Sequence, residues 1–157
     1  MAKPNKALEE EILAVMDRNL QSIWDGDGAA YSETTSEDCT FFEWYISPQR
    51  IDGLDFHLRE IRVHRMVVGG GSDPVESEEH TFEHEILQPN IQVYGSTVIV
   101  TFTLMVRVAS PGKVVHKSHN ETRVFNNFGT KKSPDWKLVH CHKSPIATPD
   151  SMSILRF

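Results

Sequence analysis

Three stretches of the sequence decide the fold: Ile51-Asp-Gly-Leu-Asp-Phe-His57, Asn120-Glu-Thr-Arg-Val-Phe125 and Trp136-Lys-Leu-Val-His-Cys-His-Lys-Ser144. The first predicts a turn at Asp-Gly that leads into a helix carrying a histidine. The other two predict strands, in which alternate residues project polar groups onto one face of a sheet. We therefore expect this helix and these strands to share one concavity.

Helices are predicted mainly in the first half of the chain. Apolar residues at helical spacing indicate a helix over Leu8–Trp24, which Asp25-Gly-Asp-Gly28 ends. One or two further helical turns are expected around Ala29–Tyr31, and the run rich in Ser, Thr and Asp up to Asp38 ends them. A third helix is predicted from Leu54 to about Met66.

The remaining segments predict strands. They are rich in β-branched and aromatic residues and cover Cys39–Ile46, Thr81–Gln88, Asn90–Tyr94, Thr97–Val108, Lys113–Asn127 and Asp135–Ser144. Short turns at Gly95-Ser96 and Ser110-Pro-Gly112 make their flanking strands antiparallel neighbours. Helices first and strands afterwards predict an α+β fold, in which a curved antiparallel sheet wraps around the long helix as a half-cone.

Length and composition predict one globular domain over residues 1–157, with a core of about 6–145 and a short tail from Pro145 to Phe157. The stretch Gly69–Pro74 is expected to be an exposed loop. A net charge of −6 argues against nucleic acid or an anionic membrane as partner. No signal peptide or membrane span is recognised, so a cytoplasmic location is expected, with Cys39 and Cys141 as reduced core thiols.

In their order and spacing, the three opening stretches resemble the association (hub) domain of calcium/calmodulin-dependent protein kinase II, within the SnoaL-like and NTF2-like superfamily. The resemblance implies an NTF2-like (cystatin-like) half-cone and homo-oligomerisation into a closed, two-layered ring of about 12–20 subunits. It also implies a kinase domain or a kinase hub as a partner. No kinase motif occurs in the sequence, so neither catalytic activity nor a cofactor is expected.

The resemblance also brings five candidate ligand residues onto or near the pocket of the cone: Tyr31, Glu43, His57, Arg123 and Lys143. A small carboxylate is the ligand class that it implies. An acid, a phenol and an imidazole around an apolar cavity would also suit proton abstraction next to a carbonyl. A SnoaL-like small-molecule enzyme of the isomerase or hydrolase type, or a ligand-binding protein, is therefore the alternative function.

The resemblance also identifies departures from the family's pocket. The family places arginines where this chain has Leu104, Val115 and Lys143. Because a lysine is a point charge without the bidentate fork of arginine, weaker carboxylate binding is expected.

Two pairs of polar residues keep more than one interpretation. Glu121 and Arg123 lie two residues apart on one strand. They are interpreted either as a structural ion pair or as an anion clamp. His140 and His142 also share a face, but local spacing supplies no third donor, so no metal is expected. The strand Thr97–Val108 carries apolar residues on both faces, which favours a second covering surface from another subunit.

Overall fold

The structure is a computed structural model that describes residues 4–68 and 80–146. The predicted loop Gly69–Pro74 and the predicted tail beyond Ile146 lie outside the described residues. The elements are α1 (Lys6–Trp24), α2 (Gly28–Thr34), β1 (Thr35–Glu43), β2 (Ile51–Asp52), α3 (Asp55–Val68), β3 (Thr81–Tyr94), β4 (Thr97–Ser110), β5 (Lys113–Asn127) and β6 (Trp136–Pro145).

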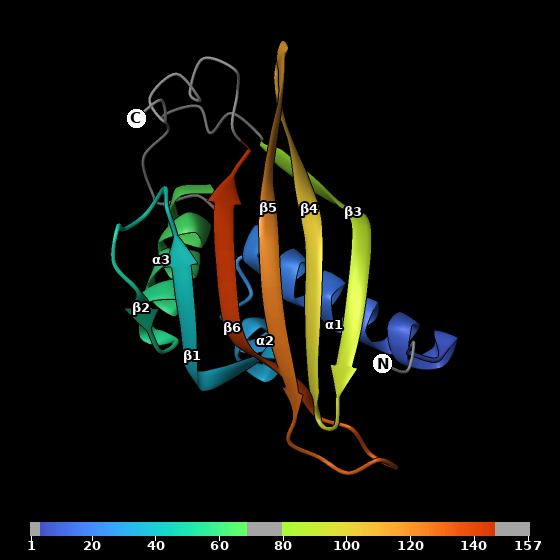
Figure 1. Cartoon of the computed structure of the whole chain (residues 1–157). Coiled ribbons are helices and arrows are strands. Elements are labelled where there is room, and N and C mark those ends of the chain that lie inside the picture. Colours follow the sequence, from blue (N-terminus) through green and yellow to red (C-terminus); the bar gives the residue numbers. More distant parts are fainter. Residues whose placement is uncertain (1–3, 69–79, 147–157) are drawn as a thin grey trace, which may run out of the picture.

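The strands form one curved sheet in the order β2-β1-β6-β5-β4-β3, and α1 lies across one face of it (Figure 1). The pairs formed by β3, β4, β5 and β6 are antiparallel, as the short turns predict. Strand β1 pairs in parallel with β6; the two strands are separated in the sequence by β2, α3, β3, β4 and β5, so no hairpin turn makes them antiparallel. The predicted α+β half-cone is confirmed, with one parallel pair added to the antiparallel sheet.

Capping residues set the ends of the first two helices. Asn5 accepts a hydrogen bond from the backbone N–H of Leu8 at 2.8 Å, so α1 begins two residues before the predicted start. At the other end, Gly26 adopts a positive φ of 67°, a conformation that glycine reaches without strain. Asp27 then caps α2 by accepting from the N–H of Ala30 at 3.0 Å.

Strand β1 differs from its predicted range at both ends. It begins at Thr35 instead of Cys39, because the hydroxyls of Thr34 and Thr35 both accept from Asn19 at 2.9 Å and bring the chain directly into the sheet. It ends at Glu43 instead of Ile46, because the carbonyl of Glu43 accepts turn hydrogen bonds from the next residues. The run rich in Ser, Thr and Asp is therefore a strand start.

Strand β3 is continuous where two strands were predicted. Its register with β4 shifts between Leu87 and Asn90, and Gln88 has a φ of 50°. Pro89 has no N–H to donate, and such a residue is tolerated at a bulge on an edge strand. The bulge therefore accommodates the proline, and the strand continues where the proline predicted an interruption.

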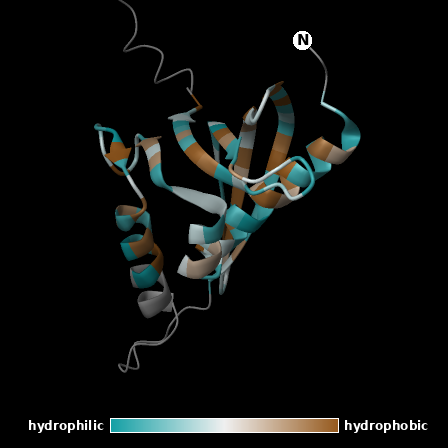
Figure 2. Cartoon of the chain, turned by 90° about the horizontal axis from the view of Figure 1, so that it is seen from below, coloured by the Kyte–Doolittle hydropathy of each residue, from teal (hydrophilic) through white to brown (hydrophobic). Residues whose placement is uncertain are grey.

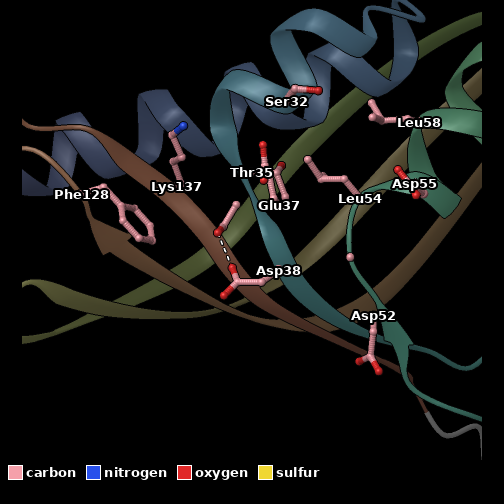
Figure 3. A pocket seen from close by; sticks show the side chains of 12 residues that line it. Ser32, Thr35, Glu37, Asp38, Asp52, Leu54, Asp55, Leu58, Phe128 and Lys137 are labelled. Atoms are coloured by element: carbon pink, nitrogen blue, oxygen red, sulfur yellow. Dashed lines mark hydrogen bonds between the residues drawn. The ribbon is translucent and has the colours of Figure 1, made fainter.

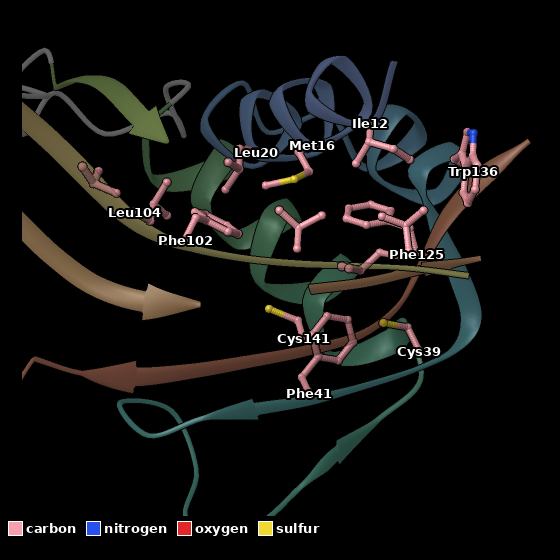
Figure 4. Packing of buried hydrophobic residues seen from close by; sticks show 14 residues of the cluster. Ile12, Met16, Leu20, Cys39, Phe41, Phe102, Leu104, Phe125, Trp136 and Cys141 are labelled. Carbon is pink, nitrogen blue, oxygen red and sulfur yellow. The ribbon is translucent and has the colours of Figure 1, made fainter. Parts of the chain in front are cut away.

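The core lies between α1 and the concave face of the sheet. Ile12, Met16 and Leu20 of α1 pack with the inward side chains of β4, β5, β6 and β1 (Figure 4). Along the strands, apolar and polar residues alternate, as the colours of Figure 2 show. Cys39 and Cys141 are both buried in the core, as predicted, and neither takes part in a disulfide.

Candidate functional site

A row of charged side chains crosses the inner face of the sheet. Glu43 of β1 lies opposite Lys143 of β6, and Lys143 lies opposite Glu121 of β5. Cross-strand partners project to the same face, so an acid, a base and a second acid follow one another across three strands. The next partner, on β4, is Phe102, and Arg123 lies two residues beyond Glu121 on the same face.

The carboxylate of Glu43 is held from two sides. His57, which α3 brings against the sheet, donates from Nε2 to Oε2 of Glu43 at 3.0 Å. Lys143 forms a salt bridge with the other carboxylate oxygen. Burial opposes ionisation, but the hydrogen bond from His57 and the charge of Lys143 lower the pKa of Glu43 to about 2. Glu43 is therefore an ionised carboxylate with both oxygens engaged.

The second acid, Glu121, is paired with Arg123 in the core. Arg123 donates from Nε to Glu121 at 2.7 Å and from Nη1 to Oδ1 of Asn19 at 2.8 Å. His119 donates to the other oxygen of Glu121 at 2.7 Å. Burial opposes ionisation, yet the charge of Arg123 and the bond from His119 hold the pKa of Glu121 well below its usual range. The structural ion pair is thus the arrangement that these two residues adopt.

Tyr31 and Lys143 complete the candidate set. The ring of Tyr31 stacks on His57 with centroids 6.1 Å apart, and burial raises the pKa of the Tyr31 phenol, so it stays protonated. For Lys143, burial opposes the charge, but Glu121 and Glu43 raise its pKa well above the usual value. Its ammonium also donates to the hydroxyl of Tyr45 at 3.0 Å.

The structure therefore brings all five predicted site residues into one buried cluster, which we call the charge network: Asn19, Tyr31, Glu43, His57, His119, Glu121, Arg123 and Lys143. Asn19 and His119 were missed. Asn19 interrupts the apolar stripe of α1, and His119 lies two residues before Glu121 on the same strand face. A polar residue at each of these positions is the sequence signal from which Asn19 and His119 could have been predicted as members of the network.

Geometry limits what this network can do chemically. A general base works best with a pKa near the operating pH, whereas Glu43 has a pKa of about 2 and both of its oxygens are occupied. Among the fully buried polar side-chain atoms of the network, in the described part of the chain, Nδ1 of His57 is without a hydrogen-bond partner. The arrangement is therefore poorly suited to proton abstraction and leaves one nitrogen for a further hydrogen bond.

Two of the three positions where the family was expected to carry arginines contribute no charge. Leu104 is buried in the apolar core, opposite His119 of β5. Val115 lies farther along the β4–β5 hairpin, opposite Val108. Lys143 and Arg123 are therefore the permanent cations of the charge network, and each is matched by an acid.

A surface cleft of about 920 Å³ lies apart from the charge network, at the start of β1 and α3 (Figure 3). Its walls carry Glu37, Asp38, Asp52 and Asp55 with a single lysine, Lys137. An acidic lining disfavours a carboxylate ligand. The cleft is therefore no substitute for the predicted pocket.

Two further sequence predictions concern metals and membranes. Nδ1 of His140 lies 2.8 Å from the hydroxyl of Thr40, and the ring of His142 packs 5.3 Å from that of Phe42. Within residues 4–68 and 80–146, no group of three or more potential metal ligands comes together. In the same part of the chain, none of the helices has the length and hydrophobicity needed to cross a membrane.

Comparison with known proteins confirms the resemblance. The family model of the calcium/calmodulin dependent protein kinase II association domain matches residues 8–147. The delta subunit of calcium/calmodulin-dependent protein kinase type II from Oryctolagus cuniculus is 26% identical over 145 residues, which is 91% of this chain and 25% of that protein. The chain thus spans about a quarter of the length of this curated relative.

Solved structures agree on the fold. The calcium/calmodulin-dependent protein kinase II hub homology domain of Chlamydomonas reinhardtii superposes with a TM-score of 0.72 at 23% identity, covering 89% of this chain and 99% of the other. An NTF2-like protein from Cytophaga hutchinsonii gives a TM-score of 0.66 at 12% identity, covering 91% and 100%. Both comparisons support the NTF2-like half-cone.

Replacing Glu121 by Gln should strongly destabilise the protein. The substitution keeps the shape of the side chain but leaves the buried charge of Arg123 uncompensated, which costs about 3–5 kcal/mol. The free energy of unfolding from urea titration, followed by circular dichroism, measures this loss. Glu83→Gln is the matched control, because the Glu83–Arg107 pair is exposed and contributes about 1 kcal/mol or less. Equal effects of the two substitutions would contradict the structural role of Glu121.

Acid should remove the stability that Glu43 contributes. A carboxylate whose pKa falls from 4.5 to about 2 on folding stabilises the protein fully above pH 4.5 and loses this effect as the pH falls to about 2. The loss amounts to roughly 3 kcal/mol. Urea titrations at several pH values in this window measure it. The Glu43→Gln variant should show a smaller acid dependence, and an unchanged dependence would contradict the assignment.

Proposed function

The chain belongs to the calcium/calmodulin-dependent protein kinase II association domain family, and on that basis we propose that it is a homo-oligomerisation hub. Its copies form a closed ring of about 12–20 subunits in two stacked layers. The observation that carries the proposal is the family match over residues 8–147, which includes the whole sheet and all but the first two residues of the helices. The proposed location is the cytoplasm.

The sheet offers a surface for such assembly. Helix α1 covers the concave face, where Val98, Val100 and Phe102 are buried. On the opposite face of β4, Ile99 and Met105 are half-buried in the single chain, so apolar area remains for a neighbour. A two-sided apolar strand supports a contact between copies, because a second subunit can complete the burial that α1 provides on one side only.

A kinase domain or a kinase hub is the partner that we propose for the assembled ring. The matched family covers the association domain, and no phosphoryl-transfer motif occurs in this sequence. The hub would thus serve to gather copies of an attached or associated protein, without transferring phosphate itself.

Light scattering tests the assembly directly. At micromolar concentration and moderate salt, the purified 17.9 kDa chain should form particles about 12 to 20 times the mass of one subunit. Size-exclusion chromatography with multi-angle light scattering gives the mass. A mass at or below that of a tetramer would contradict the ring proposal and favour the SnoaL-like enzyme or ligand-binding alternative.

A second candidate function is weak binding of a small carboxylate in the charge network. The observation that favours it is the buried Nδ1 of His57, which lacks a partner among the described residues. When the ring of His57 carries a proton on both nitrogens, Nδ1 can donate to a carboxylate, together with Lys143, Arg123 and the phenol of Tyr31. Because both cations are already paired with acids, the ligand must compete with Glu43 and Glu121 for them.

Acetate titration tests this pocket. We expect a dissociation constant of roughly millimolar size at pH 6, seen as amide chemical-shift changes around β1 and β6. Lys143→Met should abolish the changes, whereas Lys137→Met, which removes a lysine of the acidic cleft, should leave them unchanged. Neutral acetamide serves as the ligand control. No response of the wild-type protein to acetate would show that the network is structural only.

A further inference from the structure

Large apolar side chains gather at one end of the sheet. Because β1 and β6 are parallel, with Glu43 opposite Lys143, the segments that follow them leave the sheet at the same end (Figure 1). Trp44, Tyr45, Ile46 and Ile146 lie there, with between 40% and 55% of each residue exposed. We call these four residues the end patch. Exposed apolar groups gathered in this way indicate an interaction surface.

The aromatic rings of the end patch are held in place before any partner binds. Trp44 packs edge-on against Tyr45 with ring centroids 4.9 Å apart, and against His119 at 5.4 Å. The hydroxyl of Tyr45 accepts a hydrogen bond from Lys143, whose ammonium is fixed by Glu43. Preorganised aromatic side chains lose little conformational entropy on association, which is typical of the anchors of protein interfaces.

Charge indicates what kind of partner the end patch fits. The chain carries a net charge of −6, so two copies repel each other over most of their surfaces. At the end patch the neighbouring charges are balanced, since Lys143 is paired with Glu43, and Glu121 with Arg123. A neutral apolar surface lets two identical copies approach without repulsion. Among residues 4–68 and 80–146, it offers no unpaired cluster of charge to attract a strongly charged partner.

We infer that the end patch is a contact surface for a second copy of this chain, in which Trp44 and Tyr45 of both copies pack around a two-fold axis. This inference rests on the proposed hub function and assigns one of its contacts to named residues. A two-fold contact uses the same patch on both subunits, and stacking one ring on another requires a contact of this type. The end patch thus joins the two layers.

Aromatic truncation tests the inference. In the double variant Trp44→Ala/Tyr45→Ala, the oligomer mass from light scattering should fall by about half or more, because the layers separate. The matched control is Tyr94→Ala/Phe128→Ala, which removes two aromatic residues that are 50% and 56% exposed at the opposite end of the sheet. The control should keep the wild-type mass. Equal loss of mass in both variants would overturn the assignment.

A second variant tests the same contact in case the double variant loses mass only because it misfolds. Ile46→Arg leaves the contacts of Tyr45 and Lys143 intact but places two like charges at the two-fold contact, so it should also reduce the mass while the circular dichroism spectrum stays unchanged. A wild-type mass in both Ile46→Arg and the double variant overturns the end-patch assignment alone. If the wild-type protein is itself no larger than a tetramer, the hub proposal fails together with it.

Discussion

The structure depends on burying two carboxylates and two permanent cations without leaving any of them unpaired. Glu43, Lys143, Glu121 and Arg123 lie on three adjacent strands, and an isolated charge at such a depth would be prohibitively unfavourable. Besides balancing the charges, this pairing fixes the register of β1, β6 and β5, because a slip of one residue would move each side chain to the other face of the sheet.

The same network ties the helices to the sheet. Asn19 of α1 accepts from Arg123 and donates to the hydroxyls at the junction of α2 and β1, while His57 joins α3 to Glu43. Apolar packing alone positions a helix over a sheet loosely, since hydrophobic contacts are non-directional. Directional hydrogen bonds from two helices, α1 and α3, to one buried row therefore select a single arrangement of the half-cone.

Much of the fold could be predicted from the sequence, because periodicity and turn residues are local signals. The ranges of α1, β4 and β5 follow from them almost to the residue. The start of β1 could not, because Thr35 enters the sheet through a hydrogen bond from Asn19, sixteen residues away. The five candidate residues lie in one cluster, but their mutual neutralisation depends on cross-strand register, which single-strand spacing does not reveal.

Lysine at position 143 also connects the interior of the molecule to its surface. Its tetrahedral ammonium donates in different directions, to Glu43 inside and to the hydroxyl of Tyr45 at the end patch. A guanidinium, with its planar fork, suits bidentate pairing with one carboxylate and is less able to divide its donors in this way. The residue expected to weaken carboxylate binding is therefore the one that holds an exposed aromatic ring in place. In this chain the same lysine belongs both to the charge network and to the proposed contact between copies.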